Sequence, residues 1–164
     1  MGEILWSELT SGLPDRNELA HVIVRLLAAV ILGAIVGWQR ERAGKAAGLR
    51  THILVALGTT LFILAASGSG MSPDGVSRIV QGISTGIGFI GAGAILKLSD
   101  TREIKGLTTA AGIWMTAAIG VAVGLGSLGL ALLGTILTWV ILASIGLLES
   151  RFENGGDATP PEEK

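Results

Sequence analysis

The residues of this chain that could carry chemistry fall into two groups, and the first lies inside and beside apolar stretches. Arg25 interrupts one apolar stretch, and Asp74, Arg78 and Gln81 precede or open another. In a membrane, a charge at the bilayer centre costs about 2.5–3.5 kcal/mol on insertion scales, so such a residue is expected to have a partner or a function. We predict an ion pair between Arg25 and Asp74, with Gln81 beside it. The alternative is a pair that only fixes the register of two helices.

The second group lies around a basic connector, where an apolar stretch begins after several arginines. A helix start with free N–H groups beside arginines is a potential anion site. The alternative is that these cations fix topology and contact lipid phosphates. We favour the lipid role for Arg40, Arg42 and Lys45, and a specific role for Arg50, Thr51 and His52 at the helix start. The remaining candidates of this cluster are Glu41, Thr108 and Thr109.

Other kinds of site are not indicated. There are no cysteines, and His21 and His52 have no neighbours at metal-ligand spacing, so no metal site and no cofactor are expected. No pair of nucleophile and base is apparent, so we expect no enzyme. The glycines at 86, 88 and 91 spell G-x-G-x-x-G, but they lie within an apolar run, without the preceding strand or the later acidic residue that a dinucleotide site needs.

The composition of the chain indicates which kind of fold holds these residues in place. Of the 164 residues, 49 % are hydrophobic and only 15 % are charged, against about 25 % charged in soluble domains. The charges are concentrated in short connectors between long apolar runs. The net charge of −1 gives no reason to expect nucleic-acid binding. The sequence therefore predicts an all-α, polytopic membrane bundle that contacts membrane lipids.

The apolar runs define five predicted spans within a membrane domain at residues 19–148. Residues 1–18 form a polar, interfacial segment, and residues 149–164 a disordered acidic tail. Nine lysines and arginines fall on one side of this arrangement and two on the other, which predicts an N-terminus outside and a C-terminus inside. A re-entrant hairpin is the alternative at the last turn. The five spans are expected at residues 19–38, 51–68, 79–98, 107–125 and 127–148.

Small residues dominate the third predicted span, and we expect them to place it at the centre of the bundle. Glycines let neighbouring backbones approach closely in a membrane. Pro73, Asp74 and Gly75 are interpreted as a turn before this span. Because a five-helix bundle can leave such faces uncovered, a homodimer is also expected. The glycines predicted to pack helices are Gly33, Gly37, Gly82, Gly86, Gly88, Gly91, Gly93, Gly120 and Gly124.

Long motifs in this order resemble the MgtC/SapB family. They include RLLAAVILGAIVGWQRE at 25–41, GLRTHILVALGTTLF at 48–62, QGISTGIGFIGAGAIL at 81–96 and IKGLTTAAGIWMTAAIGVAVGLG at 104–126. The resemblance implies a multi-pass protein of the bacterial inner membrane, linked to magnesium limitation, acid stress and virulence. It also implies a membrane partner such as the ATP synthase. Many relatives carry a soluble ACT-like domain after the fifth span, and we expect this chain to resemble the short forms of the family without it.

Two functions remain open from the sequence. The first is regulation of a membrane partner through helix–helix contacts. The second is a small transporter or channel for an ion or a lipid-like solute, with the Arg25 and His52 groups lining its two vestibules. Because Asp74 and Glu41 are predicted on opposite faces of the membrane, a magnesium pore within one subunit is not expected.

Overall fold

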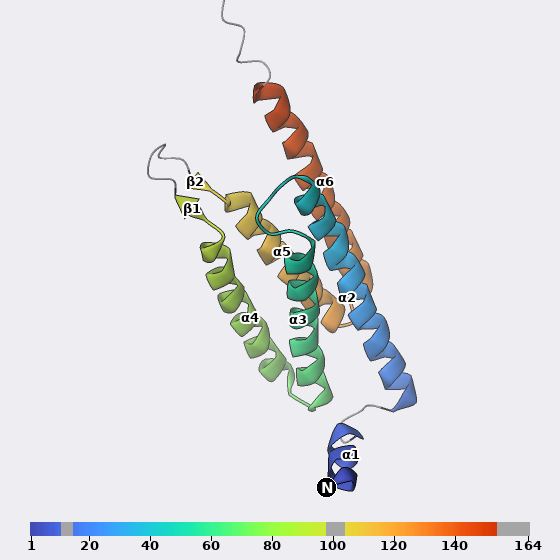
Figure 1. Cartoon of the computed structure of the whole chain (residues 1–164). Helices are drawn as coiled ribbons and strands as arrows, with labels where there is room; N and C mark the ends of the chain where they lie inside the picture. The colour runs from blue at the N-terminus through green and yellow to red at the C-terminus, as the bar shows by residue number, and fades with distance from the viewer. Residues whose placement is uncertain (11–14, 98–103, 154–164) are drawn as a thin grey trace, which may run out of the picture.

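The computed structural model of the protein describes residues 1–10, 15–97 and 104–153. Six helices make up almost all of this part, which confirms the all-α prediction (Figure 1). They are α1 (Gly2–Thr10), α2 (Arg16–Arg42), α3 (Leu49–Gly68), α4 (Pro73–Gly93), α5 (Leu107–Gly124) and α6 (Leu128–Glu153). The only strands in the described part are β1 (Leu96–Lys97) and β2 (Ile104–Lys105), which pair antiparallel between α4 and α5.

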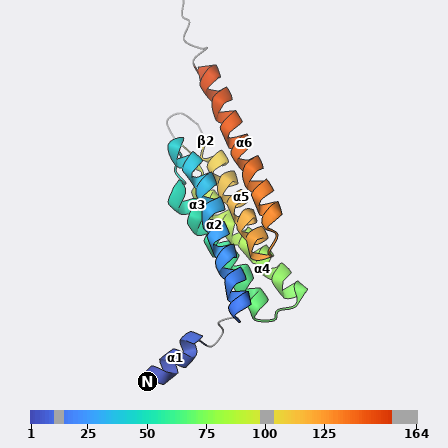
Figure 2. The ribbon, with the colours of Figure 1, turned by 90° about the vertical axis from the view of Figure 1, so that its right-hand side faces the viewer.

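Helices α2 to α6 run back and forth in one elongated bundle, while α1 lies apart from it, beyond the N-terminal end of α2 (Figures 1 and 2). The connectors after α2 and α4 lie at one end, and the α3–α4 and α5–α6 connections lie at the other. Helix α6 extends past its neighbours at the β1–β2 end (Figure 2). The basic connector is therefore at the same end of the bundle as β1 and β2.

Within the described residues, three helices, α2, α3 and α5, are long and apolar enough to cross a membrane, and α4, which corresponds to the third predicted span, is not among them. The described apolar part of α6, Leu128–Ser144, is a shorter helix of the same character. The predicted second and fourth spans agree closely with α3 and α5. The tail prediction is wrong in its first residues, since α6 continues to Glu153, and the rest of the tail lies outside the described residues.

The third predicted span has different bounds from those expected. The residues that were interpreted as a turn before this span form the start of α4. Ser72 is the N-cap, and its hydroxyl accepts a hydrogen bond from the Gly75 N–H at 3.3 Å, while Pro73 occupies the first turn. Proline is favoured there because that position needs no N–H donor. At the other end, α4 ends at Gly93, and the chain enters β1. The expected turn at 73–75 is therefore wrong.

The central position belongs to α5 and not to α4, which corrects the prediction for the glycine-rich helix. Helix α5 contacts α2, α3, α4 and α6, and nine of its 18 residues are buried. Helix α4 packs against α5 and α3 at the edge of the bundle, and only Ile87 and Gly91 of its 21 residues are buried. Glycines permit close approach, but they do not determine which helix uses it.

Close approach occurs instead along α2, α3 and α5. A Cβ atom on Gly33 would lie 2.8 Å from the His52 carbonyl oxygen, and one on Gly37 would lie 2.7 Å from the Leu49 Cα. On α5, a Cβ on Gly120 would lie 2.5 Å from the Ala56 carbonyl oxygen, and one on Gly124 would lie 2.6 Å from the Ile63 Cβ. These four glycines therefore bring the backbones of α2 and α5 against α3.

The apolar core surrounds these contacts. One cluster joins α2, α3, α5 and α6 through Ala29, Leu32, Val36, Ala56, Ile119, Val123 and Ala131. A second cluster, Ala47, Ile87, Ile113 and Ala117, attaches α4 to α5 and to the α2–α3 connector.

Candidate functional site

Polar side chains from α2 and α3 form a line of hydrogen bonds along one face of α5. We call this line the polar seam, and its members are Arg25, Arg40, His52, Thr60, Thr109 and Thr116 with the carbonyls of Gly112, Gly120 and Gly124. On α5, the members from Gly112 onward recur every four residues. Since residues four apart share a face of a helix, one face of α5 carries the whole set.

Arg25 lies at one end of the seam, where α5 turns into α6. Its Nη1 donates to the Gly124 carbonyl oxygen at 3.0 Å. The guanidinium also packs against the turn, since a Cβ on Gly126 would lie 2.6 Å from Arg25 Nη2, and Gly126 has a φ of +82°. Carbonyls at a helix C-terminus lack partners within the helix and carry the negative end of its dipole, so a cation is stabilising there.

The predicted ion pair between Arg25 and Asp74 is therefore wrong. Asp74 and Gln81 are exposed on α4, and α3 and α5 are the helices that α4 packs against. Matching the depth of two residues in a membrane did not establish that their helices are neighbours.

Arg40 lies at the opposite end of the seam. It is 4 % exposed, and its Nη2 donates to the Thr109 hydroxyl, in the first turn of α5, at 3.0 Å. The expectation that Arg40 contacts lipid phosphates is wrong for this reason. The sequence carried one usable signal: Arg40 lies three residues after Gly37, on the face of α2 that packs closely.

His52 occupies the middle of the seam and is fully buried. Its Nδ1 lies 2.7 Å from the Thr116 hydroxyl, which donates its proton to the Gly112 carbonyl at 2.9 Å. A hydroxyl has one proton, so His52 Nδ1 carries the hydrogen of the first bond while Thr116 donates to Gly112, and in the other tautomer Thr116 donates to Nδ1 instead. The Nε2 of His52 is buried and forms no hydrogen bond of good geometry, although the Ala47 backbone lies close enough to the ring to interact with it.

Thr60 completes the seam between His52 and Arg25. Its hydroxyl donates to the Gly120 carbonyl at 2.8 Å, so α3 is bonded to α5 at two levels. Thr60 and Thr116 were not among the candidates from the sequence, although its threonines were interpreted as hydrogen-bonding groups between helices, and Arg40 was assigned only the lipid role.

The second predicted group does not come together as one anion site. Arg50 and Thr108 are exposed and Thr51 is half-buried, while His52 is directed into the seam. Glu41 has a local role: its Oε2 accepts from the Leu49 N–H at 2.7 Å, which caps the start of α3. Among the described residues, no three histidines or acidic residues gather to hold a metal ion.

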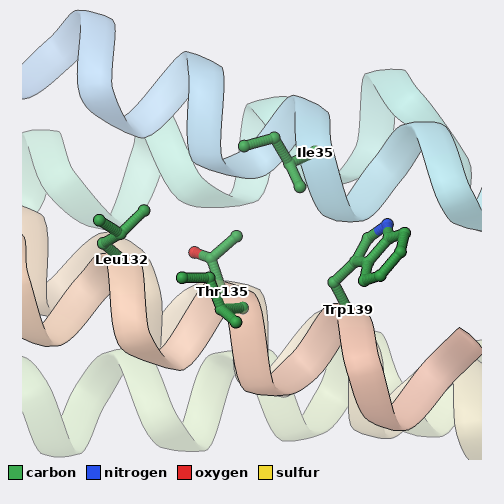
Figure 3. A pocket seen from close by; sticks show the side chains of 5 residues that line it. Ile35, Leu132, Thr135 and Trp139 are labelled. Carbon is green, nitrogen blue, oxygen red and sulfur yellow. The ribbon is translucent and has the colours of Figure 1, made fainter.

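A shallow apolar groove lies away from the seam, between α2 and α6 (Figure 3). Ile35 on α2 faces Leu132, Thr135, Ile136 and Trp139 on α6. The Thr135 hydroxyl donates to the Ala131 carbonyl of its own helix at 2.8 Å. The groove therefore presents an apolar surface without an ionisable lining residue.

Comparison of the sequence with known proteins identifies the family of this chain. The profile of the MgtC family matches residues 26–151, which cover α3, α4 and α5 and most of α2 and α6. The chain belongs to the MgtC family. The two candidate groups and the polar seam fall within or directly beside the matched region.

Three curated relatives illustrate how far the MgtC family likeness extends. Protein SrpB of Synechococcus elongatus is 42 % identical over 76 % of this chain and 75 % of its own length. “Putative magnesium transporter YhiD” of Escherichia coli is 41 % identical over 82 % of this chain and 65 % of its own. Protein MgtC of Salmonella typhimurium is 44 % identical over 83 % of this chain and 56 % of its own. The matched part thus spans less than two thirds of the latter two proteins, and no solved structure matches.

Proposed function

We propose that this MgtC family membrane protein acts by binding another membrane-embedded helix, and that it does not move a solute through its own bundle. The proposal places five spans in the bacterial inner membrane, with α4 as the third. It extends the family membership to a regulatory role in magnesium or acid-stress homeostasis. The magnesium link rests on the printed name of YhiD, and the remainder on the family resemblance.

The observation that carries the proposal is the contrast between the seam and α4. Inside the bundle, polar side chains of α2 and α3 are hydrogen-bonded to α5 at four levels, from Arg25 at one end to Arg40 at the other. On α4, by contrast, a Cβ atom added to Gly82, Gly86 or Gly88 would meet nothing within 4 Å. Most polar side chains of the seam are therefore hydrogen-bonded within the bundle, although the His52 Nε2 is not, whereas the outer face of α4 is uncovered.

A transporter for an ion is the second candidate. It is supported by the printed name of YhiD and by the Nε2 of His52, which is buried without a hydrogen bond of good geometry in the middle of the seam. Buried polar groups without partners are uncommon and are often found at functional positions. The two candidate functions differ in which residues they require. Transport would require His52, whereas binding of another helix would require the outer face of α4.

Flux into liposomes separates these functions. We expect purified protein, reconstituted around a magnesium-sensitive dye, to admit Mg²⁺ no faster than empty liposomes. The same vesicles should be tested for proton and potassium flux. A flux that His52→Phe abolishes, with the variant still folded, would refute the binding proposal and support transport.

A further inference from the structure

The exposed face of α4 has the residue spacing of a helix–helix seam. Arg78, Gly82, Thr85, Phe89 and Ala92 follow one another at intervals of 4, 3, 4 and 3 residues, and all five are exposed. Phe89 is 85 % exposed. This face lies opposite Ile87 and Gly91, the two residues that attach α4 to the bundle. Alternating intervals of 3 and 4 are those at which two helices pack side by side over several turns.

This face is unsuited to lipid. It carries Arg78, Gln81 and Thr85, and at Gly82 the backbone has no side chain to cover it. The Thr85 hydroxyl donates to the Gln81 carbonyl of its own helix at 2.9 Å, but the Gln81 amide is exposed. Polar side chains within a membrane normally face protein or water. If α4 is a span, as the proposed function has it, another protein surface covers this face.

Charge indicates which surface that is. Asp74 and Arg78 lie one turn apart at the start of α4 and are both exposed. No ion pair joins them to each other or to any other residue that the structure describes. The face therefore carries one negative and one positive group, and it is complementary in charge to a copy of itself.

In a membrane, two copies of the chain can bring these oppositely charged groups together. All copies of a chain insert with the same orientation, so two α4 helices related by a two-fold axis along the membrane normal run parallel. Asp74 and Arg78 are separated by about 6 Å along the helix axis. In such a contact each residue lies level with its own copy, so the charges would pair diagonally: the long arginine side chain of each copy would span that rise to the aspartate of the other, giving two equivalent pairs.

We propose that the outer face of α4 binds α4 of a second copy of this chain, in a parallel, two-fold symmetric contact. The pairs between Asp74 and Arg78 lie at one end of this contact, and Gly82, Thr85 and Phe89 lie along it. The inference rests on the proposed function, in which the protein binds another membrane-embedded helix. It identifies that helix as α4 of a second copy.

Cysteine cross-linking in pure proteoliposomes tests the contact directly, because the chain has no native cysteine. Gly82→Cys, Thr85→Cys and Phe89→Cys should each form a disulfide-linked dimer on mild oxidation at a high lipid-to-protein ratio. Leu133→Cys and Val140→Cys are the matched controls, since these residues are exposed on α6, and they should remain monomeric. Equal cross-linking at both helices, or none on α4, would overturn the proposal.

Charge reversal tests the identity of the partner. In the Thr85→Cys background, Asp74→Arg or Arg78→Asp alone should lower the cross-linked fraction about two- to fivefold, the effect of an exposed ion pair. The double reversal should restore it, because the two groups then exchange places on both copies. A double variant that stays as low as the single ones would contradict the pairing.

A membrane-impermeant maleimide separates failure of this contact from failure of the proposed function. If Thr85→Cys reacts fully, α4 does not lie in the membrane, and the membrane placement in the proposed function fails with the contact. If Thr85→Cys is protected but does not cross-link in pure liposomes, self-association is refuted and the membrane placement remains. Cross-linking only to a different protein in native membranes would likewise refute a second copy as the occupant.

Discussion

Replacing Gly37 by alanine should separate α2 from α3 and destabilise the bundle. The added Cβ would lie 2.7 Å from the Leu49 Cα, 3.0 Å from the Leu49 carbonyl oxygen and 3.0 Å from the His52 Cβ. Two of these atoms are backbone, so neither can rotate away. Ordinary contact for a Cβ begins at 3.4 Å, and α2 must therefore retreat by about 0.7 Å along this direction.

The cost in the free energy of unfolding comes from the contacts between α2 and α3 that this displacement weakens. Overpacking in a well-packed interior costs about 1–3 kcal/mol, and the gain in helix propensity from glycine to alanine, about 1 kcal/mol in water, offsets part of it. The expected net loss in the free energy of unfolding is about 0–2 kcal/mol relative to the unsubstituted protein, and about 1–3 kcal/mol relative to a glycine-to-alanine change without a close contact. We would measure it by unfolding in mixed micelles with increasing SDS, followed by tryptophan fluorescence.

Gly58→Ala is the matched control, because it lies on α3 and an added Cβ there meets nothing within 4 Å. It should be neutral or slightly stabilising, since only the propensity gain operates. If Gly37→Ala and Gly58→Ala unfold at the same SDS fraction, the close contact between α2 and α3 is not present in the protein, and the reasoning from glycine positions is refuted.

Three further substitutions test the polar contacts by the same unfolding assay. Arg25→Ala should cost about 1.5–3 kcal/mol, because it removes a charged donor from the Gly124 carbonyl; an unchanged midpoint would mean that water or lipid replaces the guanidinium. The double-mutant cycle of His52→Phe and Thr116→Val should show a coupling energy of about 1 kcal/mol, while strict additivity would contradict the bond between them. Glu41→Ala should cost about 1 kcal/mol through loss of the cap on α3, and a neutral result would show that solvent caps that end equally well.

The sequence was sufficient to predict the helical elements, because long apolar runs between charged connectors have few other structures available in a membrane. The second and fourth spans agree with α3 and α5 within about two residues. The start of α4 was misjudged because Ser-Pro-Asp-Gly is compatible with both a turn and a helix start. Only the conformation after Pro73 distinguishes these two structures.

The arrangement of the helices could not be predicted to the same degree. Depth in the membrane can be counted along a helix, but the direction in which a side chain points depends on which helices are neighbours. Arg25 was therefore assigned to the correct end of the bundle and to the wrong partner. The specific contact of Arg40 was missed because a basic residue at the end of a span is usually explained by topology alone, whereas this side chain is bonded to Thr109 on α5.

The two arginines of α2 also restrict how the bundle can move. Arg25 contacts the last turn of α5 and Arg40 contacts its first turn, so α2 holds α5 at both ends. A piston-like displacement of α5 along its own axis, even by the 1.5 Å rise of one residue, would stretch both hydrogen bonds together. Sliding mechanisms, in which a central helix carries a site across the membrane, are therefore disfavoured in this bundle. Tilting of the peripheral α4 against a fixed trio of α2, α3 and α5 leaves both attachments intact.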